Sequence, residues 1–200
     1  MKPAALVLAS TSTSRRAMLE SAGVTFTVVA PNVDEDLMKS MLTGGGGDGV
    51  TVADALAEAK ALAVSERHRD AVVLAADQVL VCEDRIFSKA LDEDQARRTL
   101  VTLSGREHEL ISAAVIASDG AAVWRRTEIA RLRMRKISSE FLDRYLTAEM
   151  PEILGSVGCY RIEGLGAQLF SEVSGDYFSI RGLPLIPVLS ALRDFGVLLG

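Results

Sequence analysis

The sequence predicts an α/β protein whose mixed, twisted sheet is flanked by helices. Three observations support this fold class. Strand-like and helix-like segments alternate through the first half of the chain, and the middle contains a long hairpin, which must be antiparallel. The chain has 200 residues, of which 48% are hydrophobic, so it can bury a sizeable core. We therefore expect one domain spanning residues 1–200.

The first third of the chain has a β-α-β pattern. Residues 6–9 are apolar and predict a strand, and residues 15–22 predict a helix that stops at Gly23. Residues 24–31 alternate as in a second strand and lead into an acidic stretch at 34–36. The glycine-rich residues 44–49 are interpreted as a flexible loop, because they lack the strand-then-helix context of a nucleotide-binding fingerprint.

The middle of the chain alternates again. Residues 52–64 are alanine-rich and predict a helix, and residues 71–81 predict a buried strand followed by a short return strand that reaches Lys89. Asp92 and Gln95 resemble a capping box for a helix over residues 93–103. Residues 107–117 and 121–136 predict a hairpin with its turn at residues 119–120.

The last third is less regular. Ser138 or Ser139 is expected to cap a helix that ends before Pro151. A glycine-punctuated segment follows at residues 155–166, then a strand over 168–173 and a final helix over 185–195.

Composition excludes several classes of protein. The longest apolar runs stop well short of the ~20 residues that a transmembrane helix needs, and the start of the chain is interpreted as a first strand and not a leader. Two cysteines without metal-binding spacing favour a reducing cytoplasm. The net charge of −5 argues against stable nucleic-acid binding, and alternating Arg131, Arg133 and Arg135 are typical of the solvent face of a sheet.

Four charged residues are candidates for chemistry. Asp77 ends a six-residue apolar run, where an unpaired carboxylate would be costly, so a metal ion or a lysine should compensate it. A salt-bridged or turn-capping aspartate is an equally good interpretation. Lys60 lies in an apolar helix and Lys89 follows the return strand, although either could be an ordinary surface lysine. Glu35 adds a second carboxylate after a predicted strand, where solvated turns are the commoner case.

The stretch LASTSTSRRAML, residues 8–19, adds a candidate anion site. The hydroxyls of Ser10, Ser12 and Ser14 and the amides of a helix start can bind phosphate, and Arg15 or Arg16 supplies positive charge. Plain helix capping would need only one serine. Together with the two carboxylates and the two lysines, this set is chemically coherent with metal-assisted cleavage of a phosphate bond.

Six blocks of the sequence, in this order, resemble the successive motifs of the Maf family of nucleoside triphosphate pyrophosphatases. The blocks are LASTSTSRRAML, PNVDED, LAEAKALAV, AADQVLV, SKALDEDQARRTLVTLSGREHEL and YRIEGLGAQLF with GDYFSIRGLPL. The resemblance implies two lobes around a central cleft, related to inosine triphosphate pyrophosphatases. It also implies hydrolysis of a nucleoside triphosphate to a monophosphate and pyrophosphate with a divalent cation (Mg²⁺, Mn²⁺ or Co²⁺), which removes modified or surplus nucleotides.

The resemblance assigns roles to matched positions. Asp77, Glu35 and Lys89 answer to catalytic positions, and Asp77 and Glu35 also to metal ligands. Arg15 answers to the family's invariant arginine and Lys60 to the lysine of its helix. Together with the hydroxyls of Ser10 and Ser12, these two residues are expected to bind the substrate. Three blocks depart from the family pattern: Ser-Pro-Arg-Arg is replaced by residues 12–15, Gly-Lys-Pro by residues 88–90, and Lys-Ala-Gly-Ala-Tyr-Gly-Ile-Gln by residues 156–163.

The nucleotide base is the open question. Glu163 stands where glutamine is common, and with Gln78 in the block AADQ it resembles the subgroup that acts on 7-methyl-GTP. A carboxylate can accept two hydrogen bonds from the guanine edge, whereas glutamine suits a pyrimidine. Alternatives are a dTTP or UTP pyrophosphatase and a catalytically weak nucleotide-binding regulator of septum formation. A homodimer is a further expectation.

Overall fold

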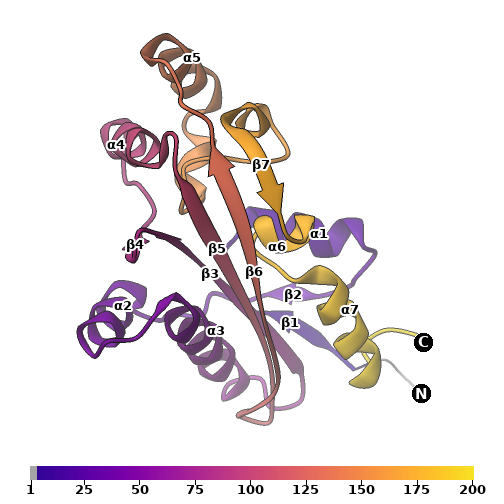
Figure 1. Ribbon diagram of the computed structural model, residues 1–200. Coiled ribbons are helices and arrows are strands. Elements are labelled where there is room, and N and C mark those ends of the chain that lie inside the picture. Colours follow the sequence, from indigo (N-terminus) through magenta and orange to yellow (C-terminus); the bar gives the residue numbers. More distant parts are fainter. Residues whose placement is uncertain (1–3) are drawn as a thin grey trace.

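A computed structural model describes residues 4–200. Its centre is one seven-stranded sheet with the strand order β2-β1-β3-β5-β6-β7, and β4 pairs with β3 outside this path. Figure 1 shows the long β5 and β6 strands running through the molecule, with α4 and α5 near one end and α3 and α7 on either side nearer the other. The predicted mixed, twisted sheet with flanking helices is confirmed.

The elements have the following bounds in chain order. The strands are β1 (Leu6–Leu8), β2 (Thr27–Val28), β3 (Val72–Cys82), β4 (Arg85–Phe87), β5 (Glu107–Ser118), β6 (Ala121–Met134) and β7 (Phe170–Ser174). The α-helices are α1 (Thr13–Ser21), α2 (Glu35–Gly44), α3 (Gly49–Ser65), α4 (Glu93–Leu103), α5 (Ser139–Glu149), α6 (Tyr177–Ile180) and α7 (Leu185–Asp194). Two 3-10 turns are η1 (Glu152–Gly155) and η2 (Leu165–Leu169).

Strand β3 creates the position of the site. One edge of β3 pairs along its length with antiparallel β5. Its other edge pairs with parallel β1 as far as Leu74 and with antiparallel β4 from Leu80 onward. Between these two partners, residues 75–79 have no neighbouring strand on that side within the described chain. Asp77 lies in the middle of this open stretch, where a cleft can reach the strand.

The β5–β6 hairpin follows its sequence signal. Asp119 and Gly120 both have positive φ, 49° and 77°, which is the conformation of a tight two-residue hairpin turn. The alternating arginines of β6 lie on the solvent side and pair with carboxylates: Arg131 with Glu109 at 2.9 Å, and Arg133 with Glu107 at 2.7 Å. Their positive charge is therefore largely balanced by neighbouring strands.

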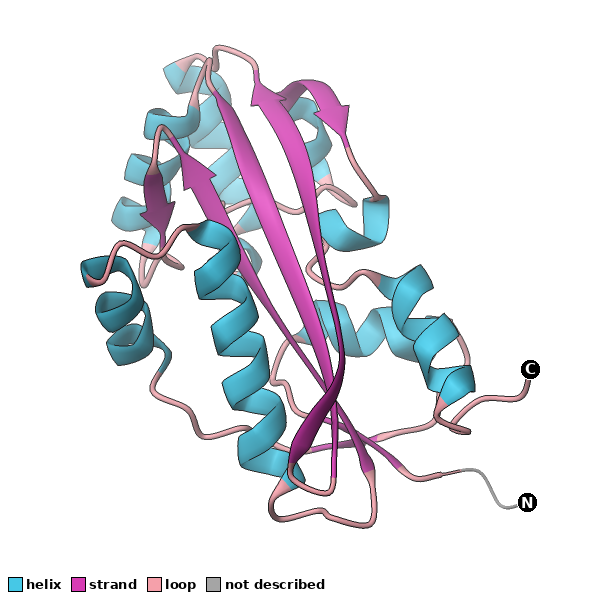
Figure 2. Cartoon of the chain, turned by 60° about the horizontal axis from the view of Figure 1, so that its bottom comes forward, coloured by secondary structure: helices cyan, strands magenta, loops and turns pink. Residues whose placement is uncertain are grey.

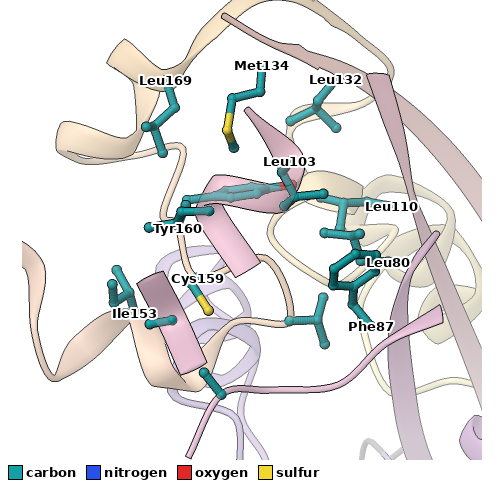
Figure 3. Packing of buried hydrophobic residues seen from close by; sticks show 14 of the residues in the cluster. Leu80, Phe87, Leu103, Leu110, Leu132, Met134, Ile153, Cys159, Tyr160 and Leu169 are labelled. Carbon is teal, nitrogen blue, oxygen red and sulfur yellow. The ribbon is translucent and has the colours of Figure 1, made fainter. Parts of the chain in front are cut away.

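Side-chain alternation along β3 separates the apolar core into layers. Val73, Ala75 and Val79 pack beneath α3, whereas Leu74 and Ala76 contribute to the cluster beneath α1 and α7. Figure 2 shows α3 lying along one face of the sheet. A third cluster joins the far end of the sheet to α4, α5 and the segment around Tyr160 (Figure 3). The first two clusters form one lobe and the third cluster forms the other. The two lobes meet at the open stretch of β3.

The structure corrects three predicted elements and adds one. The acidic stretch at 34–36 was expected in a loop, but it begins α2, which Asp34 caps by accepting a hydrogen bond from the Leu37 amide at 3.0 Å. The predicted strand at 24–31 shortens to β2, because β1, the strand with which it pairs, is itself three residues long. Helix α6 was not predicted. The strand expected over 168–173 begins at Phe170, because η2 takes the preceding residues.

Within residues 4–200, no helix combines the length and the apolar character that crossing a lipid bilayer would require.

Candidate active site

A cleft of about 1090 Å³ lies where the open stretch of β3 meets the two lobes. One wall comes from the β1–α1 loop, the start of α2 and Lys60 of α3. The opposite wall comes from residues 88–91 after β4 and from segment 155–163. The predicted site residues share this one space: its lining includes Ser10, Ser12, Arg15, Glu35, Lys60, Asp77, Gln78, Lys89 and Glu163.

Lys60 joins the two carboxylates at the floor of the cleft. Its Nζ lies 2.6 Å from Asp77 Oδ1 and 2.8 Å from Glu35 Oε1. Side-chain exposure is only 6% for both Lys60 and Asp77, against 41% for Glu35. Burial raises the pKa of Glu35, but the hydrogen bond and positive charge of Lys60 outweigh it and leave that pKa below its ordinary value. Both acids are thus held close to one buried cation.

The β1–α1 loop combines helix capping with a cationic side chain. Ser12 is the N-cap of α1, and its hydroxyl accepts a hydrogen bond from the Arg15 amide. Arg15 Nε donates to the carbonyl of Gly182 at 2.7 Å. Gly182 has φ +97°, so a side chain there would strain the turn that presents this carbonyl. Burial lowers the pKa of Arg15, and Asp77 and Glu35 partly offset this effect.

Lys89 lies on the opposite wall from Arg15. It follows the end of β4 by two residues, so it belongs to a loop and not to the return strand itself. Desolvation and the charge of Arg15 lower the pKa of Lys89, whereas Glu35 partly raises it. Arg15 and Lys89 are thus close enough for the charge of Arg15 to lower the pKa of Lys89, and both line the cleft. Two cations in one cleft favour binding of a polyanionic ligand.

The other end of the cleft is built from hydrogen-bonded polar side chains. Gln78 Nε2 donates to the Ser112 hydroxyl and to the carbonyls of Ser179 and Ile180, at 2.9 to 3.0 Å. Glu163 lies 3.4 Å from the Nε of Arg181. The Gln78 NH₂ group therefore holds residues 179–180 against β3. None of these three hydrogen bonds uses the Gln78 side-chain oxygen.

Tyr160 and Arg161 complete that end of the cleft. The Tyr160 hydroxyl lies 2.7 Å from Nε2 of buried His108. Arg161 donates two hydrogen bonds to Glu149 Oε2, at 2.9 and 3.1 Å, and Glu149 is almost fully buried. Burial lowers the pKa of His108 to about 4, so the imidazole is neutral at pH 7.

A divalent cation fits the donors available. Asp77 Oδ2 is buried and has no hydrogen-bond partner, although Oδ1 of the same carboxylate is occupied by Lys60. Carboxylate oxygens are hard donors, and Mg²⁺ commonly uses one or two of them and takes its other ligands from water and phosphate. Across residues 4–200, His, Cys, Asp and Glu nowhere gather in threes that could bind an ion alone. A bound phosphate would have to complete the ligand set.

Comparison with known proteins agrees with this geometry. The family described as Maf-like protein matches residues 5–195. The chain belongs to the Maf family. A relative from Granulibacter bethesdensis, named nucleoside triphosphate pyrophosphatase, is 47% identical over 94% of this chain and 96% of its own length. One from Mesorhizobium japonicum, named 7-methyl-GTP pyrophosphatase, is 46% identical over 98% of both chains. A Brucella abortus protein with the same name is 45% identical over 94% of both.

This Maf chain also places residues in its cleft that sequence reasoning missed. Lys39, one helical turn after Glu35, lines the cleft, as do Tyr160, Arg161 and Arg181. The sequence carried a weak signal for Lys39, since a helix starting at Glu35 puts residues four apart on one face. Nothing in the sequence indicated that Arg181 would reach Glu163, because the two residues come from different elements.

Proposed function

We propose that this chain is a nucleoside triphosphate pyrophosphatase, a hydrolase that cleaves the α-β phosphoanhydride to give a nucleoside monophosphate and pyrophosphate. The observation that carries the proposal is Asp77. Its buried carboxylate lies on an open stretch of β3, is engaged by Lys60 through Oδ1 only, and lines a cleft whose walls carry Arg15 and Lys89. The names of close relatives support the same activity.

The proposed work of the chain is to bind the triphosphate, to hold a water molecule and to stabilise negative charge. Asp77 Oδ2 is the acceptor available to orient and deprotonate the attacking water. Arg15 and Lys89 neutralise charge on the phosphates as the bond to the leaving pyrophosphate breaks. The amides and hydroxyls of residues 10–14 complete the anion site at the start of α1. Lys60 lies between Asp77 and Glu35 and offsets their negative charge.

A divalent cation is part of the proposal. Glu35 and Asp77 are the residues that would hold it, and when bound it would supply charge neutralisation and polarise a phosphoryl oxygen. Purified protein treated with EDTA should lose turnover, and Mg²⁺, Mn²⁺ or Co²⁺ should restore it.

For the substrate, we propose 7-methyl-GTP as the preferred nucleotide. Glu163 offers carboxylate oxygens in the lining of the cleft, and relatives named for 7-methyl-GTP share 45 to 46% identity with this chain. Release of pyrophosphate from 7-methyl-GTP, GTP, dTTP and UTP tests this directly. A clear preference for dTTP or UTP would overturn the base assignment and leave the pyrophosphatase activity standing.

The regulator of septum formation makes a different prediction in the same assay. It requires tight nucleotide binding without pyrophosphate release by the metal-loaded protein. Retention of an ion-paired Asp77 inside the cleft favours the enzyme, because binding alone has no use for a free carboxylate oxygen next to the phosphates. A homodimer stays a prediction, which light scattering of the purified chain would check.

A further inference from the structure

We infer that Arg181 is a positioning residue that holds Glu163 in place for recognition of the nucleotide base. The inference deepens the proposed function and rests on it for the nature of the ligand. Its starting point is the 3.4 Å contact between Arg181 Nε and Glu163 Oε1. The two side chains are 19% and 31% exposed, so the pair is partly shielded from solvent inside the cleft.

Arg181 extends from a turn that is tied to two other parts of the site. Gln78, next to Asp77 on β3, donates to the carbonyls of Ser179 and Ile180 at 3.0 Å. The hydroxyl of Ser14 donates to the Arg181 carbonyl at 3.0 Å, and Arg15 donates to the next carbonyl at 2.7 Å. Hydrogen bonds thus fix the turn to β3 and to the β1–α1 region. From this fixed turn, the Arg181 side chain reaches Glu163.

Glu163 needs such support because its own backbone is irregular. Segment 155–163 contains turns and no strand, and Glu163 is followed by Gly164 before the short η2. No other ion pair or hydrogen bond is recorded for the Glu163 side chain in the described chain. A carboxylate on such a segment would lose binding energy to conformational entropy unless a partner fixed it beforehand.

The pairing leaves Glu163 free to bind a base. Arg181 Nε lies 3.4 Å from one Glu163 oxygen without donating a hydrogen bond to it, so the roughly four acceptor positions of the carboxylate stay available to the two N–H groups of a guanine edge. Arg181 Nε is buried without a hydrogen-bond acceptor in the described chain, and Arg181 Cζ lies 5.6 Å from the centroid of the Tyr177 ring. We assign Arg181 to Glu163 and not to the phosphates because Glu163 is the carboxylate with which it forms an ion pair.

A double-mutant cycle tests this inference. Arg181→Met keeps an unbranched apolar stem and removes the guanidinium with its charge, and it should raise the KM for 7-methyl-GTP or GTP about fivefold with little change in kcat. In a Glu163→Gln background the same substitution should change KM by less than about twofold, because its target is gone. Arg181→Lys should recover part of the loss. Inhibition by inorganic tripolyphosphate, which has no base, should be unchanged by Arg181→Met.

Arg193→Met on α7 is the matched control, since Arg193 is exposed outside the cleft and its side chain donates to the Leu189 carbonyl within the same helix. An Arg181→Met effect of equal size in both backgrounds, or a weaker tripolyphosphate inhibition, would overturn the inference. If the purified chain binds nucleotide but releases no pyrophosphate, the proposed function fails, and the same cycle is then measured as Kd for 7-methyl-GMP.

Discussion

The two ends of the cleft are built by different means. At the phosphate end, the charged side chains come from or directly flank regular elements: Asp77 on β3, Lys60 on α3 and Glu35 at the start of α2. At the base end, Glu163 and Arg161 come from turns and are held by ion pairs to Arg181 and Glu149. Under the proposed function, the residues assigned to the reaction lie on β3 and two flanking helices, whereas the residues assigned to base selection lie on an irregular segment that can vary without disturbing them.

The largest expected effect is at the phosphate end, from Asp77→Asn. The amide cannot accept a proton from water at neutral pH, so kcat should fall about 10³-fold or more. The amide oxygen can still accept a hydrogen bond from Lys60, so the melting temperature should change little. Pyrophosphate release with Mg²⁺ or Mn²⁺ measures the first effect and thermal denaturation the second.

Asp119→Asn is the control for that substitution. Asp119 lies in the exposed β5–β6 turn, where asparagine tolerates the positive φ of 49°, and it pairs only with exposed Arg69. Its turnover should equal that of the wild type. Near-normal activity of Asp77→Asn would show that another group activates the water.

Lys60→Met should harm stability as well as turnover. Removing the ammonium leaves the buried Asp77 carboxylate without its partner, which costs about 3 kcal/mol of unfolding free energy. Loss of organised charge beside the phosphates should lower kcat about 100-fold. Lys136→Met, at an exposed lysine outside the cleft, should stay within about 0.5 kcal/mol of the wild type in urea titrations. Equal stability of the two variants would contradict the role given to Lys60.

The same contrast explains what the sequence could predict. The run of apolar residues before Asp77 predicted both its burial and its need for a compensating group, and the hairpin turn was readable from Asp119 and Gly120. Helix α2 was missed because its residues are poorly buried and its C-terminal end runs into glycines. The Arg181–Glu163 pair joins residues from separate elements, and only the folded backbone determines that distance.

At the base end, we expect a pH effect from His108. Its folded-state pKa of about 4 lies below the ordinary 6.5, so below pH 6.5 the unfolded chain binds a proton that the folded chain refuses. The contribution of neutral His108 to the free energy of unfolding is complete above pH 6.5 and is lost as the pH falls toward 4. His108→Gln keeps a partner for the Tyr160 hydroxyl and cannot titrate, so its loss of stability between pH 7.5 and 4.5 should be smaller by roughly 2 to 3 kcal/mol.

Urea unfolding at the two pH values measures that difference. Parallel pH dependences in the wild type and His108→Gln would mean that His108 is protonated without cost in the folded protein. A smaller change of unfolding free energy with pH in His108→Gln would show that the apolar cluster around Tyr160 is the acid-sensitive part of the protein. His108 packs against Phe170 in that cluster.

The smallest expected effect compares two helix caps that differ only in location. Ser12 caps α1 inside the cleft, and Ser138 caps α5 outside it, where its hydroxyl accepts from the Phe141 amide at 3.2 Å. Alanine at either position should cost about 1 kcal/mol of unfolding free energy. Only Ser12→Ala should also raise KM, by about threefold, because one hydroxyl near the phosphates contributes on the order of 0.5 to 1 kcal/mol. A matching rise in KM for Ser138→Ala would show that loss of stability, and not phosphate contact, causes the change.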